Sequence, residues 1–377
     1  VFFLPKFSGY KVYILIQSTA ILMAVIGTDW VNGIFEDYFY ITVRYIAVQC
    51  ICLLAMFVFV RQPEDIIPYC IISVLATNGG NLINIFYVGK YAKIRFTFNM
   101  DLKRHLLPLL ILFVNSIAIT IYVNSDITML GFFESDAQVG VYSFASKIYN
   151  LLKQLINAVV VVSVPRIAYI LKNKSEEYKT FINKIFSALN IILLPIIVGM
   201  FCMSDSMILL AGGEQYISGE AALKILSVAT LFAIYASLFT NCVLIVNGQE
   251  KYCLEATVVS AIVNVAMNLV LMPRLGMIGA AITTVLAEFV NCMMQIYFSR
   301  IFFSWKMLDI KSVESCLCGS VAIGIICILC NQYFDRSLWR MISASLISVV
   351  VYAGILIVTK NPTVHDYICA IAKKRKD

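Results

Sequence analysis

The chain has 377 residues, of which 61% are hydrophobic and 14% are charged, and its net charge is +7. Soluble domains are about one quarter charged, so this composition excludes a soluble globular protein and indicates a polytopic membrane protein. The excess positive charge gathers in the predicted connections on one side of the membrane, so it does not indicate a nucleic-acid partner.

Apolar stretches of about 20 residues, the length of a helix that crosses a bilayer, recur through the chain. They predict an all-α fold with eleven membrane spans, at 10–29, 41–60, 66–88, 106–125, 140–163, 178–202, 221–247, 252–272, 277–299, 313–331 and 339–358. Lys and Arg accumulate in short cytoplasmic connections. This rule assigns 89–105, 165–177 and 360–377 to the cytoplasm and the acidic connections 126–139 and 204–220 to the outside.

The chain opens with VFFLPKF, which looks like the outer end of a helix. With eleven spans and a cytoplasmic tail, Val1 lies outside, so we expect an odd number of spans to precede it. The loops VNGIFEDYFYITV (31–43) and VNGQEKYCLEATV (246–258) share Asn-Gly, an acid and a Tyr. Transporters often consist of such repeats. If each loop joins the fourth and fifth helices of a six-helix repeat, three spans precede residue 10.

The predicted span at 140–163 carries two lysines. At about 100° per residue, its polar side chains fall on one face: Ser143, Ser146, Lys147, Asn150, Lys153, Gln154 and Asn157. A central lysine costs about 2.5–3.5 kcal/mol on insertion scales, so this face is predicted to line a wet cavity or the bundle interior. Lys147 is close enough to the outer end to snorkel. Lys153 lies about 20 Å from either end and needs a substrate or an internal salt bridge.

Two later spans carry polar stripes at helical spacing: Thr257, Ser260, Asn264 and Asn268, and then Thr284, Glu288, Asn291 and Gln295. Such amides either hydrogen-bond helices together or face a substrate. Glu288 lies in the middle of its span. The sequence leaves open whether it pairs with a lysine or couples transport to a cation, and Asp126 is a second candidate for these roles.

Metal, cofactor and catalytic sites are not predicted. The CILC motif at 327–330 lies inside an apolar span, where Cys packs as a small apolar residue. Neither His105 nor His365 has neighbours at metal-ligand spacing.

Four stretches resemble signature sequences of the Wzx-type flippases, which move lipid-linked polysaccharide repeat units for O-antigen or capsule. They are GTDWVNGIFEDYFYITVRYIAVQ (27–49), NSDITMLGFFESDAQVGVYSFASKI (124–148), NAVVVVSVPR (157–166) and VNGQEKYCLEATVVSAIVNVAMNLVLMPRLGMIGAAITTVLAEF (246–289). The resemblance implies a MATE-like fold of the MOP superfamily, with two six-helix lobes around a central cavity and two further C-terminal helices. It implies fourteen spans, of which this chain has the last eleven.

The same resemblance divides the chain into the rest of an N-terminal lobe (1–88), a basic cytoplasmic loop (89–105), a C-terminal lobe (106–300) and two extra helices with a basic tail (301–377). Arg44, Lys147 and Arg166 match basic positions of the family pattern. Gln49 and Ile127 stand where the family often has Lys, which leaves fewer basic groups in the cavity.

These observations predict a transporter and not an enzyme: a flippase that moves undecaprenyl-pyrophosphate-linked oligosaccharide across the bacterial cytoplasmic membrane by alternating access. Ammonium groups suit the pyrophosphate, amides and hydroxyls suit the glycan, and an opening to lipid suits the tail. The predicted partners are this substrate, membrane lipid, a coupling Na+ or H+, and other membrane proteins of polysaccharide assembly. The predicted substrate-site residues are Lys147, Lys153, Arg44, Asn150, Gln154, Asn157, Asn264 and Asn268.

Two other functional classes stay open, one a transporter and one an enzyme. A MATE-like, cation-coupled exporter of cationic drugs would favour buried carboxylates, and Glu288 keeps this alternative alive. A membrane polysaccharide polymerase would need a long outer loop with catalytic groups, whereas the predicted outer connections are short. A purely structural membrane protein would leave Lys153 unexplained.

Overall fold

The computed structural model describes residues 9–35, 37–91, 124–173, 175–302, 310–334 and 336–365, together with Leu106, Phe113, Ile117 and Thr120. Regular structure in these residues is helical, without a strand. The predicted loop at 89–105 and span at 106–125 lie largely outside the described residues, as does the tail from residue 366. Contacts between helices divide the chain into two compact units, residues 1–102 and 103–377.

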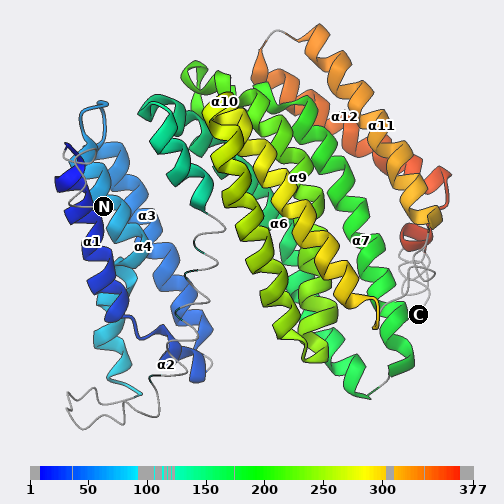
Figure 1. Cartoon of the computed structure of the whole chain (residues 1–377), viewed down its shortest axis with the longest axis horizontal. Coiled ribbons are helices and arrows are strands. Elements are labelled where there is room, and N and C mark those ends of the chain that lie inside the picture. Colours follow the sequence, from blue (N-terminus) through cyan, green and yellow to red (C-terminus); the bar gives the residue numbers. More distant parts are fainter. Residues whose placement is uncertain are drawn as a thin grey trace. The chain divides into compact units, whose positions relative to one another are not determined.

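The first unit is built around α4, which packs against both α1 and α3. Asp37 caps α3, because its side chain accepts a hydrogen bond from the backbone N–H of Tyr40 at 3.4 Å. α3 and α4 are long and apolar enough to span a membrane, whereas α1, with 15 residues, is shorter. The helices of this unit are α1 (Lys11–Val25), α2 (Asp29–Ile34), α3 (Tyr38–Phe59) and α4 (Ile66–Val88) (Figure 1).

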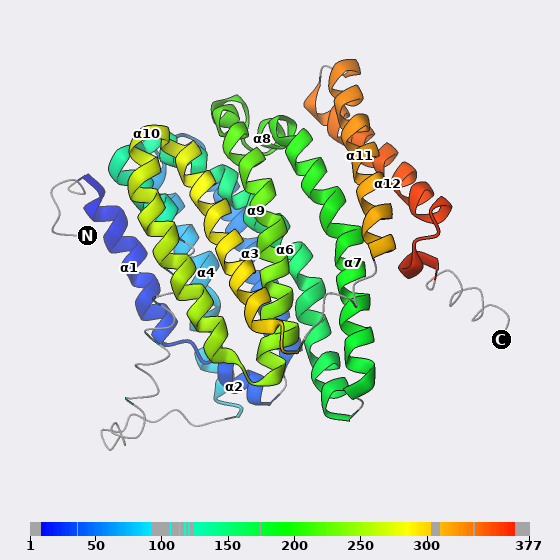
Figure 2. The ribbon, with the colours of Figure 1, turned by 45° about the vertical axis from the view of Figure 1, so that its right-hand side comes forward.

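The second unit follows with a helical segment at 124–133. In this unit α10 packs along α9, and α11 contacts both α7 and α12, as Figure 2 shows. Its elements are α6 (Asp136–Asn173), α7 (Ser175–Cys202), α8 (Ser204–Gly212), the 3-10 turn η2 (Glu214–Gly219), α9 (Glu220–Phe239), the π turn η3 (Thr240–Leu244), η4 (Ile245–Asn247), α10 (Glu250–Ser299), α11 (Ile310–Tyr333) and α12 (Ser337–Val358).

The 50 residues of α10 form a hairpin of two helices. A straight helix of this length would measure about 75 Å, more than twice the ~30 Å hydrocarbon core of a bilayer. The chain reverses at Gly276, whose φ of 54° and ψ of −131° suit glycine alone, shortly after Pro273. The two halves then run side by side (Figure 1). A Cβ on Gly279 would lie 2.7 Å from the Leu271 carbonyl oxygen, so a small residue permits this close approach.

The described residues contain eight helical segments that are long and apolar enough to cross a membrane. One of them is α10, which contains the two predicted spans 252–272 and 277–299. The remaining predictions are the span at 10–29, which corresponds to the shorter α1, and the largely undescribed span at 106–125. The predicted all-α, polytopic membrane fold is confirmed.

Candidate functional site

Lys153 of α6 and Glu288 of α10 form an ion pair inside the second unit. Lys153 Nζ lies 3.5 Å from Glu288 Oε1, and the two side chains are 27% and 8% exposed, respectively. Charge-assisted N–H···O contacts are usually about 2.7–2.9 Å long, so this pair is loose. The Tyr149 hydroxyl donates to the same oxygen at 3.4 Å, and the Tyr149 ring centroid lies 4.8 Å from Lys153 Nζ.

This ion pair separates two polar pockets, and both of its side chains line both pockets. The first, smaller pocket is also lined by Asp126, Tyr142, Ser146, Tyr149, Asn150, Asn264 and Thr284. The second has a volume of about 280 Å³ and is also lined by Gln154, Asn157, Ser237, Thr240, Asn241, Thr257, Asn291 and Gln295. Lys153 therefore borders both polar pockets.

Asp126 is a buried carboxylate of the first pocket, with 8% of its surface exposed. It lies in the helical segment 124–133, so the connection between this segment and α6 is shorter than the predicted 126–139. Asn268 Nδ2 donates to Oδ1 at 2.8 Å, while the hydroxyls of Thr284 and Tyr142 donate to Oδ2. All three donors are neutral, and no ion pair among the described residues includes Asp126.

The two polar stripes of α10 meet at Asp126 because the hairpin places their helices side by side. The Thr283 hydroxyl donates to Asn268 Oδ1, and the Asn268 amide donates to Asn264 Oδ1 at 3.1 Å as well as to Asp126. Ser125 donates to the same Asn264 oxygen at 2.6 Å. Asn264 and Asn268 thus hold helices together, and Asn264 also lines the first pocket.

The second pocket has polar groups from several helices. Ser237 donates to Asn157 Oδ1 at 2.5 Å, and Asn241 donates to Ser237 Oγ at 3.0 Å. Asn241 belongs to the π turn η3, a type of distortion that is frequent at functional sites. Gln295 is 1% exposed, and its Oε1 has no hydrogen-bond partner in the described part of the chain. A buried amide oxygen left open in this way can accept a hydrogen bond from a ligand.

Most of the predicted site residues of the second unit meet around these pockets: Lys153, Asn150, Gln154, Asn157, Asn264 and Glu288 line them, and Asn268 contacts Asp126. Lys147 is exposed and lines neither pocket. Arg166 is also exposed, with its guanidinium 5.6 Å from the Tyr169 ring centroid.

Arg44 belongs to the first unit, where its side chain is 6% exposed. Its Nη2 donates to both oxygens of Asp29, at 2.8 and 2.6 Å. Asn84 donates to Asp29 at 2.8 Å, and Asn32 donates to Asn84 at 2.8 Å. Nε and Nη1 of Arg44 are buried without a hydrogen-bond partner within the described ranges. This network therefore joins α2, α3 and α4.

Polarity patterns do not single out Tyr142 and Tyr149, because tyrosine counts as apolar in a search for helical periodicity. Tyr149 nevertheless precedes Lys153 by four positions, which places both on the same face of α6. This spacing is the signal in the sequence that identifies Tyr149. The contacts of Tyr142 with Asp126 and Thr284 depend on other helices, so no spacing within α6 predicts them. Asn241 follows its partner Ser237 by four positions, so this helical spacing is the signal for their contact.

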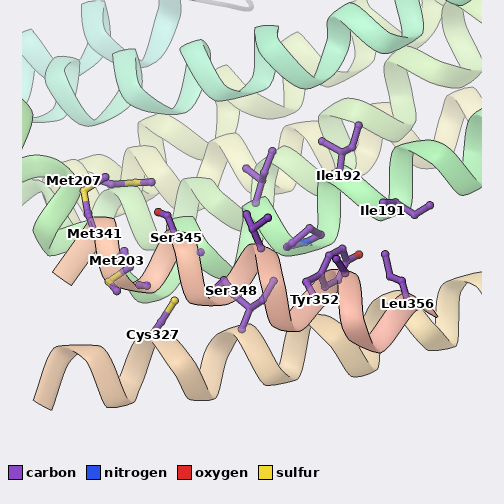
Figure 3. Close-up of a pocket in the computed structure, with 17 residues that line it drawn as sticks. Ile191, Ile192, Met203, Met207, Cys327, Met341, Ser345, Ser348, Tyr352 and Leu356 are labelled. Atoms are coloured by element: carbon purple, nitrogen blue, oxygen red, sulfur yellow. The ribbon is translucent and has the colours of Figure 1, made fainter. Parts of the chain in front are cut away.

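An apolar groove extends from α12 to α6. One part lies between α7, α11 and α12, where Ile192, Cys327 and Tyr352 are among the lining side chains (Figure 3). Met207 and Met341 line this part and also a second part beside α6, which includes Leu151, Leu155 and Gln154. Gln154 lines the second polar pocket too. Gln154 therefore lies at the boundary between the apolar groove and the polar pocket.

Residues 32–221 match the model of a family described as polysaccharide biosynthesis proteins. The chain belongs to this family. The match includes Arg44, Asp126 and Lys153 and ends at the start of α9.

Curated relatives of this polysaccharide biosynthesis protein come from archaea. The chain is 22% identical over 216 residues to the probable low-salt glycan biosynthesis flippase Agl15 of Haloferax volcanii, covering 56% of this chain and 46% of the relative. It is 27% identical over 165 residues to the probable flippase AglR of the same organism, covering 43% and 34%. The chain thus spans less than half the length of each.

Among solved structures, the lipid II flippase MurJ in an inward closed conformation is similar, with a TM-score of 0.73 and 16% sequence identity. The match covers 95% of this chain and 75% of that chain. These comparisons confirm the family resemblance and the predicted multi-pass helical fold.

Proposed function

We propose that this polysaccharide biosynthesis protein is a flippase for lipid-linked oligosaccharides. The observation that carries the proposal is the junction at Gln154 between an apolar groove and a polar pocket that contains Lys153. A lipid-linked oligosaccharide has the same division, with an apolar chain joined through phosphate to a hydroxyl-rich glycan. The printed names of the two Haloferax relatives support the same activity.

The polar pocket suits the head of such a substrate. Lys153 offers an ammonium group to a phosphate, and Gln154, Asn157 and Asn241 offer amides to hydroxyl groups. The open Oε1 of Gln295 accepts a hydrogen bond from a further hydroxyl. The groove that contains Met207 and Met341 suits the apolar chain. Translocation then proceeds by alternating access, and no covalent bond is made or broken.

Finer assignments follow from the sequence resemblance. We propose undecaprenyl pyrophosphate as the carrier, the bacterial cytoplasmic membrane as the location and the cytoplasm as the side of the C-terminus. Arg44 and Lys147 are proposed as additional contacts for the anionic carrier, and other membrane proteins of polysaccharide assembly as partners.

A coupling cation, Na+ or H+, is proposed to bind at Asp126. The support is the burial of this carboxylate among neutral donors. A buried ionised carboxylate without a counter-charge is unfavourable, so a bound cation or a proton stabilises it.

A MATE-like exporter of cationic compounds is the second candidate. The observation in its favour is that two carboxylates, Asp126 and Glu288, line the same pocket. The pairing of Glu288 with Lys153 opposes it, since the lysine neutralises the charge that a cationic drug would bind.

Replacing Lys153 by Met in the full-length protein tests the flippase proposal. The substitution keeps side-chain length and removes the charge, so membrane insertion becomes easier and expression is maintained. Transport falls sharply, because a charge-assisted contact contributes about 1.5–3 kcal/mol, or roughly ten- to a hundredfold in binding. Lys153→Arg retains part of the activity because it keeps the charge.

The measurement is recovery of surface polysaccharide in cells that lack their own flippase, with protein level determined in parallel. Lys224→Met is the matched control, because it removes a lysine that pairs with Glu220 on the same helix, away from both polar pockets. Normal polysaccharide from well-expressed Lys153→Met protein would show that Lys153 does not bind the substrate.

A further inference from the structure

We infer that an anionic substrate displaces Glu288 from Lys153 and that the released carboxylate then binds a sodium ion. The anion and the cation would therefore bind together, and the ion pair would be the element that couples them. The inference rests on the proposed function, because it takes Lys153 as the contact for the substrate phosphate.

The first support is the geometry of the ion pair. A separation of 3.5 Å is longer than a well-formed charge-assisted hydrogen bond. The lysine side chain is 27% exposed and lines both polar pockets. A phosphate that enters the second pocket meets Lys153, because this side chain lines it. Phosphate brings more negative charge and more acceptor oxygens than a carboxylate, so it competes effectively for the same ammonium group.

The second support is the position of Glu288 after such an exchange. Its side chain is 8% exposed, and Lys153 is the basic residue that pairs with it. Loss of that partner would leave a buried charge uncompensated, which is strongly unfavourable. Glu288 also shares the first pocket with Asp126, so two carboxylates would face the same small space. A cation relieves both effects.

The third support is the chemistry of the first pocket. Besides the two carboxylates, Tyr149, Asn264 and Thr284 contribute side-chain oxygens to its lining. Hard cations prefer oxygen ligands of these kinds. Sodium fits the requirement for a single positive charge, because it replaces the one charge that Lys153 withdraws.

The consequence is a reciprocal coupling: sodium strengthens anion binding, and the anion strengthens sodium binding by the same factor. Couplings between sites in proteins are typically about 5- to 150-fold. We expect an effect of about tenfold here.

The test measures binding of geranyl pyrophosphate, a short amphipathic anion, to the purified full-length protein in uncharged detergent. Titrations are compared in sodium chloride and in choline chloride at equal ionic strength, which keeps charge screening constant. Wild-type protein is expected to bind about tenfold more tightly in sodium. Glu288→Gln removes the competing carboxylate, so binding in choline becomes as tight as wild-type binding in sodium, and the sodium effect disappears.

Glu220→Gln is the control, because it removes a carboxylate from an ion pair at the start of α9 that lines neither pocket. It should keep the wild-type response to sodium. Asp126→Asn identifies the origin of the coupling: if it abolishes the sodium effect while Glu288→Gln preserves it, the coupling belongs to Asp126 and the inference is wrong.

Two further outcomes separate this inference from the proposed function. Binding that requires Lys153 but responds neither to sodium nor to Glu288→Gln overturns the exchange and leaves the flippase proposal standing. Binding that is equally tight in Lys153→Met protein overturns both, since Lys153 is then not the anion contact.

Discussion

Each unit of the molecule contains a basic residue paired with a carboxylate, but the two pairs differ in tightness and in orientation. In the first unit Arg44 contacts Asp29 at 2.6 Å, with the arginine 6% and the aspartate 43% exposed. In the second unit Lys153 contacts Glu288 at 3.5 Å, with the lysine 27% and the glutamate 8% exposed. The buried partner is thus the base in one pair and the acid in the other.

This difference separates a structural contact from an exchangeable one. Asp29 also accepts a hydrogen bond from Asn84, which in turn contacts Asn32, so the arginine pair is part of a network across three helices. Among the described residues, Lys153 pairs with one carboxylate, at 3.5 Å, and it lines two pockets. An arriving anion can contact the ammonium group of Lys153 directly, whereas the buried guanidinium of Arg44 becomes available only when its contacts with Asp29 open.

Removal of the lysine should have the largest effect on stability. Lys153→Met leaves the buried Glu288 carboxylate without its counter-charge, which typically costs about 3–5 kcal/mol, whereas Arg44→Met leaves Asp29, which is 43% exposed and still accepts a hydrogen bond from Asn84. Thermal unfolding of the purified protein should show a marked loss for Lys153→Met and a smaller one for Arg44→Met. Equal losses for the two variants would remove the distinction between the pairs.

Disruption of the α10 hairpin should have the next largest effect, confined to the second unit. Gly276→Ala introduces a Cβ that collides with the Glu134 carboxylate, and it forces alanine to adopt φ of 54°. Strain of this kind costs about 1–3 kcal/mol. It would also displace Thr284 from Asp126, so transport should fall with stability.

Gly354→Ala is the control for the hairpin, because a Cβ at this exposed position of α12 meets no other atom within 4 Å. It should leave stability unchanged or raise it slightly. Comparison of unfolding temperatures for the two alanine variants provides the measurement, and equal temperatures would contradict the requirement for glycine at position 276.

The smallest effect concerns Asp37, at the start of α3. Hydrogen bonds from the hydroxyls of Tyr91 and Tyr87, at 2.6 and 2.8 Å, hold the pKa of Asp37 below its usual value. A lowered folded-state pKa stabilises the protein above the unfolded pKa near 4, and this contribution is lost as pH falls through the folded value. Tyr91→Phe should therefore lower the unfolding temperature slightly at pH 6, and this difference from wild type should shrink toward pH 3.

Several features of the site could be predicted from the sequence. Helical spacing placed Asn264, Asn268 and Glu288 on consistent faces, and the cost of a buried charge singled out Lys153. The sequence leaves two roles open for Glu288, a partner for a lysine or a group that couples transport to a cation. The choice between them depends on the position of α6 relative to α10, and residue spacing within either helix gives no information on that position.

Other features required the three-dimensional structure. Asp126 lies at the end of a predicted span, and charge rules assign such a residue to an outer connection. Its burial results from contacts with Asn268 and Thr284, which belong to the two halves of the α10 hairpin. The boundary between the apolar groove and the polar pocket at Gln154 likewise involves side chains from five helices, α6, α8, α9, α10 and α12, so no single stretch of sequence encodes it.

The central claim is that the ammonium group of Lys153 serves the substrate and not only the fold. The most direct test uses a variant in which the two charges are exchanged, Lys153→Glu together with Glu288→Lys. Surface polysaccharide is measured in cells that express this variant, and thermal unfolding is measured on the protein purified from them. The exchanged pair keeps its attraction, so the exchanged protein should unfold closer to wild type than Lys153→Met does. The more exposed position 153 then presents a carboxylate to the phosphate, and the ammonium group is moved to the buried position 288, so polysaccharide should be lost. Normal polysaccharide from the exchanged protein would show that the pair is structural and would contradict the claim.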